Sequence, residues 1–316
     1  MIRIQNATRR YGGVLAVDGV TVSIEKGEVV GLLGHNGAGK TTLMKMLTGV
    51  LEPTAGELMV AGKSITEART DAQRHVGYLP ESAPLYPEMP VYEYLMLMAE
   101  LRGVPSAQQE AAVLGAAEAT GLDGRLAQPI RELSKGYRQR VGIAQAIVHD
   151  PDVLILDEPT NGLDPVQIES IRTLVKRLAE RTTIVLSTHI LQEVEAVCDR
   201  VLIMIDGQLS ADAPLQSLLQ SRTLRISVRD GVDLKTALGG VDGVVVVRRE
   251  GPDEDNAGYV AWSVDLADGA ALGPSLLHTL QQKGVDLASF APEHRTLEGV
   301  FKQLQREHVA RQESAA

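Results

Sequence analysis

A short apolar run followed at once by a glycine-rich segment is the feature that most restricts how this chain can fold. The run is Val29–Leu33, the segment is Gly34–Thr41, and a helical pattern extends from Lys40 to about Leu47. An apolar run bounded by glycines is typical of a buried strand in a parallel sheet. A chain built around such a strand is expected to alternate strands with helices.

The alternation continues to about residue 213. Further strands are predicted at Thr21–Ile24, Val153–Leu156, Thr183–Ser187 and Val201–Ile205, and helices at Arg138–Val148 and after Pro165. A largely helical insertion is expected from about residue 85 to 148, because the pattern from Val91 to Gly121 is also helical. The fold class is therefore α/β, a parallel core with helices on both faces and some antiparallel β elements.

Beyond about Ala213 the order of elements changes to β-α-β-β-α-β, the split arrangement of ferredoxin-like folds. We predict a domain of residues 1–218, a small C-terminal α+β domain of residues 219–305, and a frayed tail of residues 306–316. The strands are expected at Leu224–Val228, Val244–Arg248, Tyr259–Val264 and Val285–Phe290, and the helices at Leu234–Leu238 and Leu276–Lys283.

The glycine-rich segment has the P-loop pattern G-x-x-x-x-G-K-[ST] between a predicted strand and a predicted helix. Its glycines let several backbone N–H groups converge on one point, and the helix adds the positive end of its dipole, so the loop suits a phosphate. Lys40 supplies a charge for the β- and γ-phosphates of a nucleotide, and the Thr41 hydroxyl suits Mg²⁺. The alternative is an ordinary glycine-rich turn. The residues predicted to contact ATP here are Gly34, His35, Asn36, Gly37, Ala38, Gly39, Lys40, Thr41 and Thr42.

Two acidic residues follow the predicted strand Val153–Leu156 directly. Ligands bind at the carboxyl ends of strands in open α/β sheets, so Asp157 is placed to hold Mg²⁺. Glu158 is the candidate for polarising an attacking water, which makes it, with Lys40, a predicted catalytic residue. Paired acids after a strand can also simply cap the next turn.

The segment Leu133–Arg140 reads LSKGYRQR. Here the sequence resembles the ATPases of ABC transporters, whose signature is usually LSGGQ. Ser134 and Gly136 stand at the signature's serine and second glycine, whereas Lys135 and Tyr137 depart from its commonest form. Taken alone, Ser134 is more simply interpreted as a helix N-cap. The resemblance covers about residues 2–218 and implies a P-loop NTPase core of the ABC type.

The resemblance also implies roles for four residues outside these motifs. Tyr11 would stack on adenine, and Asp164 lies in the D-loop. His189 stands at the switch histidine, which would make it a third catalytic residue. Glu81 occupies the Q-loop position, where the family normally has glutamine; it would contact ATP or Mg²⁺ while adding negative charge. Three of them have a simpler alternative: Tyr11 as a half-exposed aromatic, Asp164 as an N-cap before Pro165, and His189 as a structural histidine.

In ABC proteins two ATPs lie between two nucleotide-binding domains, and this chain carries one set of motifs. The resemblance therefore implies ATP and Mg²⁺ as cofactors, a second nucleotide-binding subunit (a homodimer or a similar chain) and a membrane permease. Tyr78–Glu81, the lysine in the signature and Thr296–Phe301 resemble ATPases of ABC-2-type permeases, including the gliding-motility and nitrous-oxide-reductase-maturation types. We expect part of Ser82–Tyr92 to touch the permease. The methionines at 89, 96 and 98 suit either that surface or helix packing.

Composition limits the classes of partner and the cellular location that this chain can have. A net charge of −10 argues against nucleic acid as a partner. No apolar stretch approaches the roughly 20 residues of a membrane-spanning helix, so a cytoplasmic chain, peripheral on the membrane through its permease, is expected. Cys198 alone forms no internal disulfide and is expected to be a buried small residue in the helix before Asp199. Two other functions stay open: an ABC ATPase acting on ribosomes or DNA, and an ATP-gated regulator that hydrolyses slowly.

Overall fold

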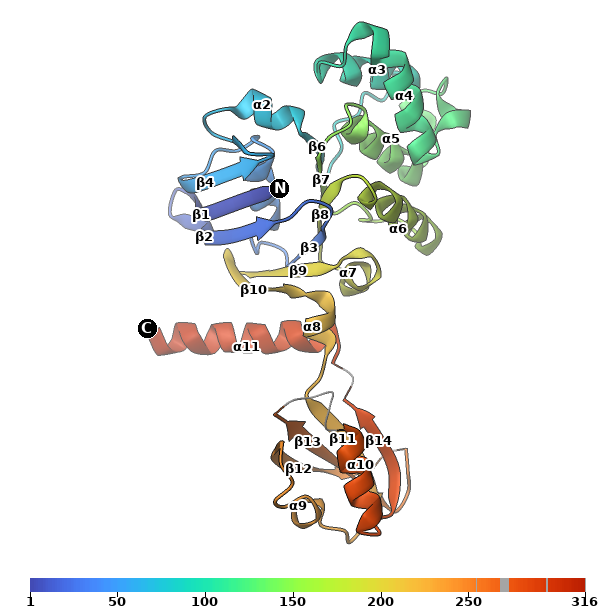
Figure 1. Cartoon of the computed structure of the whole chain (residues 1–316). Coiled ribbons are helices and arrows are strands. Elements are labelled where there is room, and N and C mark those ends of the chain that lie inside the picture. The colour runs from blue at the N-terminus through green and yellow to red at the C-terminus, as the bar shows by residue number, and fades with distance from the viewer. Residues whose placement is uncertain (254, 268–272, 294, 316) are drawn as a thin grey trace. The chain divides into compact units, whose positions relative to one another are not determined.

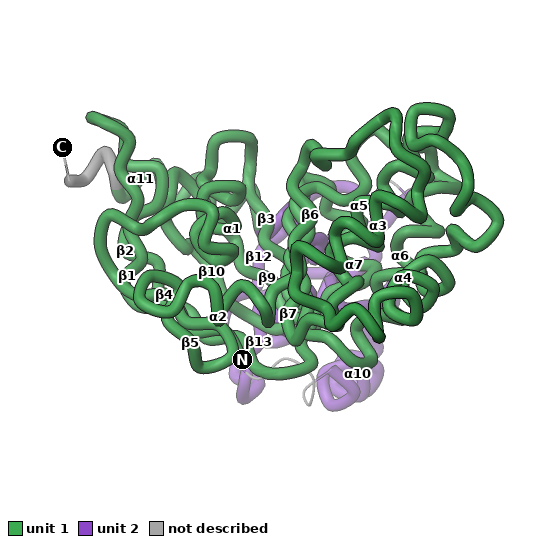
Figure 2. The backbone as a smooth tube through the Cα atoms, turned by 90° about the horizontal axis from the view of Figure 1, so that it is seen from above, with its two compact units in different colours: residues 1–215, 301–316 green, residues 216–300 purple. Residues whose placement is uncertain are grey.

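A computed structural model describes residues 1–253, 255–267, 273–293 and 295–315. The chain divides into two units, shown in Figure 2. Unit 1 contains residues 1–215 and 301–316, and unit 2 contains residues 216–300. The sequence placed the corresponding boundaries after residues 218 and 305. Among the described residues, no helix is both long and apolar enough to cross a lipid bilayer.

A six-stranded sheet forms the centre of unit 1 (Figure 1). Five neighbouring strands are parallel, and the edge strand β10 is antiparallel to β9. Strands β3 and β7 are buried along their whole length, as their uninterrupted apolar runs predict. The predicted α/β core is confirmed. In sheet order the strands are β10 (Gln208–Pro214), β9 (Arg200–Ile205), β3 (Val29–Leu33), β8 (Thr183–Thr188), β7 (Val153–Asp157) and β6 (Val76–Leu79).

A second, antiparallel sheet lies over one face of the first (Figure 1). Helix α1 (Lys40–Leu47) packs against both sheets. Leu43 and Met44 of α1 share a buried cluster with side chains of both sheets. Helices α6 (Pro165–Ala179) and α7 (Leu191–Val197) cover the opposite face (Figure 1). The antiparallel strands are, in sheet order, β2 (Val14–Ile24), β1 (Ile2–Tyr11), β4 (Ala55–Val60) and β5 (Lys63–Ser64), and the short helix α2 (Arg69–Arg74) follows β5.

The helices between β6 and β7 have a hydrophobic core of their own, around Tyr94, Leu95 and Val141. The methionines at 89, 96 and 98 pack against this core half-buried, so ordinary helix packing accounts for them. The helices are α3 (Val91–Leu101), α4 (Ser106–Thr120) and α5 (Lys135–Ile147), with single 3-10 turns at Asp123–Arg125 and Ile130–Glu132.

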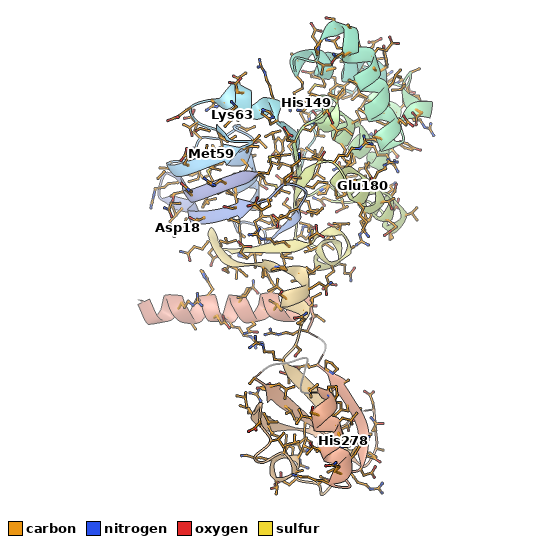
Figure 3. The ribbon with its side chains drawn as sticks, in the orientation of Figure 1. Asp18, Met59, Lys63, His149, Glu180 and His278 are labelled. Carbon is orange, nitrogen blue, oxygen red and sulfur yellow. The ribbon has the colours of Figure 1, made fainter. Side chains whose placement is uncertain are left out.

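Unit 2 is an antiparallel sheet of order β12-β13-β11-β14 with the element order β-α-β-β-α-β. This is the predicted ferredoxin-like arrangement, in which the third strand lies between the first and the second. On α10, Leu276 and Leu280 are buried, while His278 between them is exposed (Figure 3). The elements are β11 (Thr223–Arg229), α9 (Leu234–Ala237), β12 (Val244–Pro252), β13 (Tyr259–Leu266), α10 (Gly273–Gln282) and β14 (Leu287–Pro292); helix α8 (Leu215–Leu219) precedes them.

The predicted frayed tail is wrong. Residues 306–315 continue the helix α11 (Leu297–Ala315), whose residues from Phe301 onward belong to unit 1. The less exposed face of α11 contains Val300, Leu304 and His308, which are spaced four residues apart. This spacing is typical of a helix, although most of the residues around them are polar. The other correction concerns Cys198, which is buried as expected but lies just after α7 rather than inside a helix.

Candidate functional site

The motifs meet where the parallel strands of unit 1 end. Strand β3 leads into the glycine-rich loop, β7 ends at Asp157, and β8 ends just before His189. The register aligns these ends, because Leu33 lies opposite Thr188 and Asp157 lies opposite Ser187. A cavity of ≈ 310 Å³ opens there, lined by Ala16, Asn36, Gly37, Ala38, Gly39, Lys40, Thr41, Thr42, Glu81, Glu158, Asn161 and His189.

The glycine-rich loop adopts a backbone that other residues resist. Gly37 and Gly39 have φ of +86° and +99°, in the left-handed region that glycine enters without steric penalty. A Cβ on Gly39 would lie only 2.3 Å from the carbonyl oxygen of Ala16. Gly39 also caps α1, so the free N–H groups of that helix's first turn face the cavity side of the loop. The loop thus has the chemistry of an anion cradle.

Lys40 is buried, with only 6% of its surface exposed. Its Nζ donates to the carbonyl oxygens of Gly34 at 2.7 Å and His35 at 3.2 Å and lies 3.8 Å from Glu158 Oε1. Burial lowers the pKa of Lys40, and the negative charge of Glu158 opposes that shift. The ammonium group is therefore held in place by loop carbonyls, beside the groups where a phosphate would lie.

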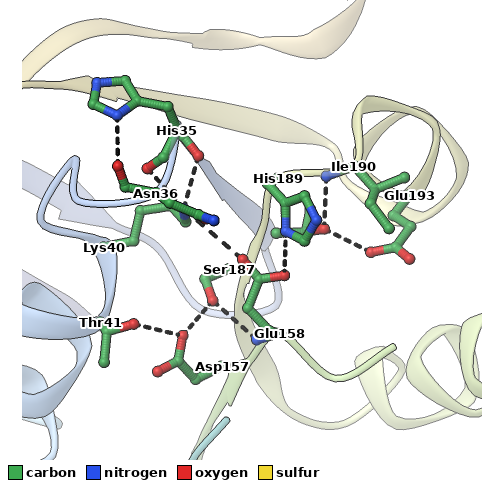
Figure 4. A network of polar contacts seen from close by, with 12 residues as sticks. His35, Asn36, Lys40, Thr41, Asp157, Glu158, Ser187, His189, Ile190 and Glu193 are labelled. Carbon is green, nitrogen blue, oxygen red and sulfur yellow. Dashed lines mark hydrogen bonds and ion pairs between the residues drawn. The ribbon is translucent and has the colours of Figure 1, made fainter. Parts of the chain in front are cut away.

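Asp157 is fully buried and forms a network with two hydroxyl groups (Figure 4). Ser187 Oγ donates to its Oδ1 at 2.5 Å, and Thr41 Oγ1 donates to the same oxygen at 3.3 Å. The other oxygen, Oδ2, is buried without a hydrogen-bond partner. An unsatisfied buried carboxylate oxygen beside a threonine hydroxyl fits Mg²⁺, which takes oxygen ligands and completes its shell with water and phosphate oxygens.

Glu158 stands in the left-handed region with φ of 49°, where a non-glycine residue is strained. Ser187 holds it there, because the backbone N–H of Glu158 donates to Ser187 Oγ at 3.0 Å. Its Oε2 contacts His189 Nδ1 at 2.8 Å (Figure 4). Burial raises the pKa of Glu158, and His189 and then Lys40 oppose the shift. A partly desolvated carboxylate on a strained turn next to an imidazole can orient or deprotonate a water.

A buried carboxylate behind the cavity was not found from the sequence. Glu193 of α7 is 3% exposed and accepts hydrogen bonds from the hydroxyls of Thr188, at 2.7 Å, and Thr160. These two threonines flank His189 and Glu158 in sequence, so Glu193 joins the loops that carry them. The sequence predicted a helix before Asp199 but gave no signal that Glu193 would be buried in it, because its partners come from two other loops.

Ala16, from β2, and Ser187 were also missed. Ala16 lines the cavity and its carbonyl oxygen lies against Gly39. Ser187 bridges Asp157 and the backbone of Glu158. Both lie in unremarkable strand sequences, and only the approach of distant strands gives them a role.

Several predicted residues do not line the cavity. The Gly34 carbonyl oxygen accepts a hydrogen bond from Lys40 Nζ, and the His35 ring contacts Asn36 and Asp206. Tyr11 is 45% exposed at the end of β1, with the Arg9 guanidinium 4.8 Å above its ring. Glu81, by contrast, does line the cavity.

The signature residues and Asp164 serve as local structure within this chain. Ser134 and Asp164 each cap a helix, accepting from the backbone N–H of Tyr137 at 3.4 Å and of Gln167 at 2.9 Å. Gly136 is buried against the Gln167 side chain, which a Cβ would meet at 2.8 Å. None of the three is among the residues that line the 310 Å³ cavity.

Comparisons with known proteins agree with this geometry. A family model described as "ABC transporter" matches residues 17–161. The Nod factor export ATP-binding protein I of Burkholderia orbicola (strain AU 1054) is 38% identical over 224 residues, 70% of this chain and 73% of that protein. The chain belongs to the ABC transporter family. The bacitracin transport ATP-binding protein BcrA of Bacillus licheniformis is 36% identical over 69% of this chain and 71% of its own length.

Solved ABC structures share the fold over about two thirds of this chain. One ATP-binding subunit of an ABC transporter is 31% identical, with a TM-score of 0.63 over 69% of this chain and 91% of that chain. A bacterial ABC transporter cassette solved as a dimer is 26% identical, with a TM-score of 0.62 over 68% of this chain and 99% of that one. The protein is therefore an ATP-binding subunit of an ABC transporter and an ATP-hydrolysing cassette.

Proposed function

We propose that this ABC cassette works as a dimer with a second cassette, a homodimer in the simplest case, and drives export through an ABC-2-type permease. The dimer is proposed because, within one chain, the signature residues are separated from the cavity that the other motifs form. The cavity contains the P-loop, Glu158 and His189, whereas Ser134 and Gly136 do not line it. A second copy would supply that missing half, and a related cassette has been solved as a dimer.

In this proposal the residues of the cavity, together with the buried Asp157 beside Thr41, have separate roles toward MgATP. The N–H groups of the loop and Lys40 bind the phosphates, Thr41 and Asp157 hold Mg²⁺, and Glu158 orients the attacking water with His189 beside it. The metal supplies charge neutralisation for phosphoryl transfer, and the chain supplies position and desolvation. Tyr11 faces solvent, where it would stack on the adenine ring.

Export is the direction that the relatives support. Two of them are described as Nod factor export and bacitracin transport proteins. The ABC-2 assignment rests on the sequence resemblance at Tyr78–Glu81, Lys135 and Thr296–Phe301. With a permease in the membrane, the cassette would be cytoplasmic and peripheral.

The surface for the permease would lie next to the nucleotide cavity. A second cavity of ≈ 480 Å³ is lined on one side by the segment after β6 and on the other by the start of α5, and it shares Glu81, Glu158 and Asn161 with the first. Tyr86, in the segment Ser82–Tyr92, is 53% exposed. A partner bound in this cavity would contact Glu81, so a movement of Glu81 would change its contacts with the partner. The lining residues of this second cavity are Glu81, Ser82, Ala83, Leu85, Pro87, Lys135, Arg138, Gln139, Glu158 and Asn161.

Cross-linking tests this proposal. Single cysteines at Ser82, Tyr86 and Pro87, in cells that also express the neighbouring permease gene, should form adducts with the permease. The native Cys198 is buried and need not be removed. A cysteine at Val245, 63% exposed on unit 2, is the matched control. Adducts at Val245 but none in Ser82–Tyr92 would reject the coupling surface, and a soluble partner in every adduct would reject the permease.

A further inference from the structure

The turn between β9 and β10 lies directly behind the P-loop. It consists of Asp206 and Gly207, whose φ values of 48° and 81° are both left-handed, as in the tight turns of two-residue hairpins. The N–H of Gly207 donates to the Ala38 carbonyl oxygen at 3.1 Å, and the N–H of Asp18 donates to the Gly207 carbonyl oxygen at 2.9 Å. The P-loop backbone is thus hydrogen-bonded to this turn.

The Asp206 carboxylate lies between two imidazoles from distant parts of the sequence. His35 Nε2, in the P-loop, is 3.4 Å from its Oδ1, and His308 Nε2, on α11, is 3.3 Å from its Oδ2. The His308 side chain is 11% exposed, so α11 holds it against the turn. One carboxylate therefore connects the C-terminal helix to the P-loop.

The contact extends into the loop backbone. The other ring nitrogen of His35, Nδ1, donates to the Asn36 carbonyl oxygen at 2.8 Å (Figure 4), so the ring is an imidazolium when Nε2 also donates to Asp206. Asn36 lines the nucleotide cavity, and its neighbour Ala38 accepts from Gly207. A change in the position of Asp206 would therefore move both a side chain and a backbone contact of the loop that receives the phosphates.

A cavity beside the contact leaves the helix room to shift. It measures ≈ 520 Å³ and is lined on one side by His35, Ile205 and Asp206 and on the other by α11 residues between Lys302 and Ala310. Displacing this part of α11 changes the His308–Asp206 contact without unpacking the buried cluster around α1.

We propose that His308 and Asp206 are positioning residues for ATP binding, through which α11 sets the affinity of the P-loop for the nucleotide. Neither touches the cavity; both act through His35. Because linkage is reciprocal, bound ATP would favour the docked position of this part of α11. The inference goes beyond the proposed function and needs only ATP binding by the cassette, whatever the permease.

The expected effect is small, since Asp206 is 53% exposed and solvent weakens its contacts. His308→Ala should raise the Kd of the chain for a Mg-bound, non-hydrolysable ATP analogue about threefold. Steady-state assays should show a similar rise in KM with an unchanged kcat. His308→Gln keeps an N–H donor at the same reach and should bind like the wild type.

Further variants test whether His308 acts on the P-loop through Asp206. Asp206→Asn should weaken binding about as much as His308→Ala, and the double variant should be no weaker than Asp206→Asn alone, because both act through one carboxylate. Glu307→Gln, on an exposed neighbour in the same helix, is the control and should bind like the wild type. Additive effects, an unchanged Kd in His308→Ala, or an equal loss in Glu307→Gln would overturn the proposal.

Discussion

The two sheets at the centres of units 1 and 2 differ in what they bury. In unit 1, the ends of the parallel strands bury charged and hydroxyl groups together: Lys40, Asp157, Glu158, Ser187, Thr188 and Glu193. Among the residues of unit 2 that the structure describes, Ser227 is the buried polar side chain, and the core is otherwise apolar. Parallel strands bring loops from distant sequence to one edge, whereas antiparallel neighbours send successive loops to opposite ends.

The comparison teaches where strain and polarity are tolerated. Glu158 occupies a left-handed backbone and an apolar environment at once, and the cost of both is offset by Ser187, His189 and Lys40. Among its described residues, unit 2 buries no such strained carboxylate: the buried Ser227 hydroxyl donates to Asp253, and the indole N–H of Trp262 is buried without a hydrogen-bond partner. Changes in the first region should therefore alter chemistry, and changes in the second should alter stability alone.

The largest effect is expected from Glu158→Gln. The amide keeps the size of the side chain but cannot accept a proton, so kcat should fall at least about 100-fold while ATP still binds. Gel filtration with MgATP should then show a trapped dimer. Turnover like that of the wild type would remove Glu158 from its assigned role, and a monomer at saturating ATP would count against the dimer.

In unit 2, Leu280→Ala sharpens the contrast. Leu280 is fully buried on α10, and the cavity left by alanine should destabilise this unit by about 2–4 kcal/mol. Denaturant unfolding should show an earlier transition, while kcat measured below that transition stays unchanged. His278→Ala, on the exposed face of the same helix, is the control and should unfold like the wild type. A loss of turnover in folded Leu280→Ala would show that the two regions are not separable in this way.

The smallest effect concerns His149, labelled in Figure 3, which follows α5 and donates through Nε2 to the Val76 carbonyl oxygen at 3.2 Å. Burial, with Arg102 nearby, lowers the pKa of His149 to about 4. The neutral ring stabilises the folded state above its unfolded pKa of about 6.5, and that stability is lost as the pH falls from there toward 4.

His149→Gln keeps an N–H donor but does not titrate, so it should lessen the loss of stability at pH 5 by on the order of 1–2 kcal/mol. Denaturant melts at pH 5 and pH 7.5 measure it. An identical pH dependence in the variant would show that other groups carry the acid sensitivity.

Much of the site was predictable because its chemistry is local in sequence. The P-loop and Asp157–Glu158 each combine a strand, its carboxyl end and the reactive side chain within a few residues. Helix α1 was predicted with its observed bounds, since the glycine before it and the apolar spacing within it are both strong signals. The partners of Glu193 and the position of Ala16 were not predictable, because they depend on which strands become neighbours.

The packing of helix α11 was also not predictable from the sequence. Its polar residues suggested a frayed end. In the structure, however, His308 contacts Asp206, 102 positions earlier in the sequence, in the turn behind the P-loop. A surface helix of mixed polarity gains most of its stability from the surface it packs on, and the sequence does not name that surface.

The sequence by itself determined the parallel core, the anion-binding loop and the acidic strand end, because each depends on side chains and backbone freedom within a short segment. Only the tertiary structure decided that Ser187 and Glu193 support the catalytic loops, that Ser134 lies outside the cavity of its own chain, and that His308 reaches Asp206. Those contacts join residues whose separation along the chain carries no information about their distance in space. Strand order and helix docking set that distance, and both follow from burying the whole chain at once.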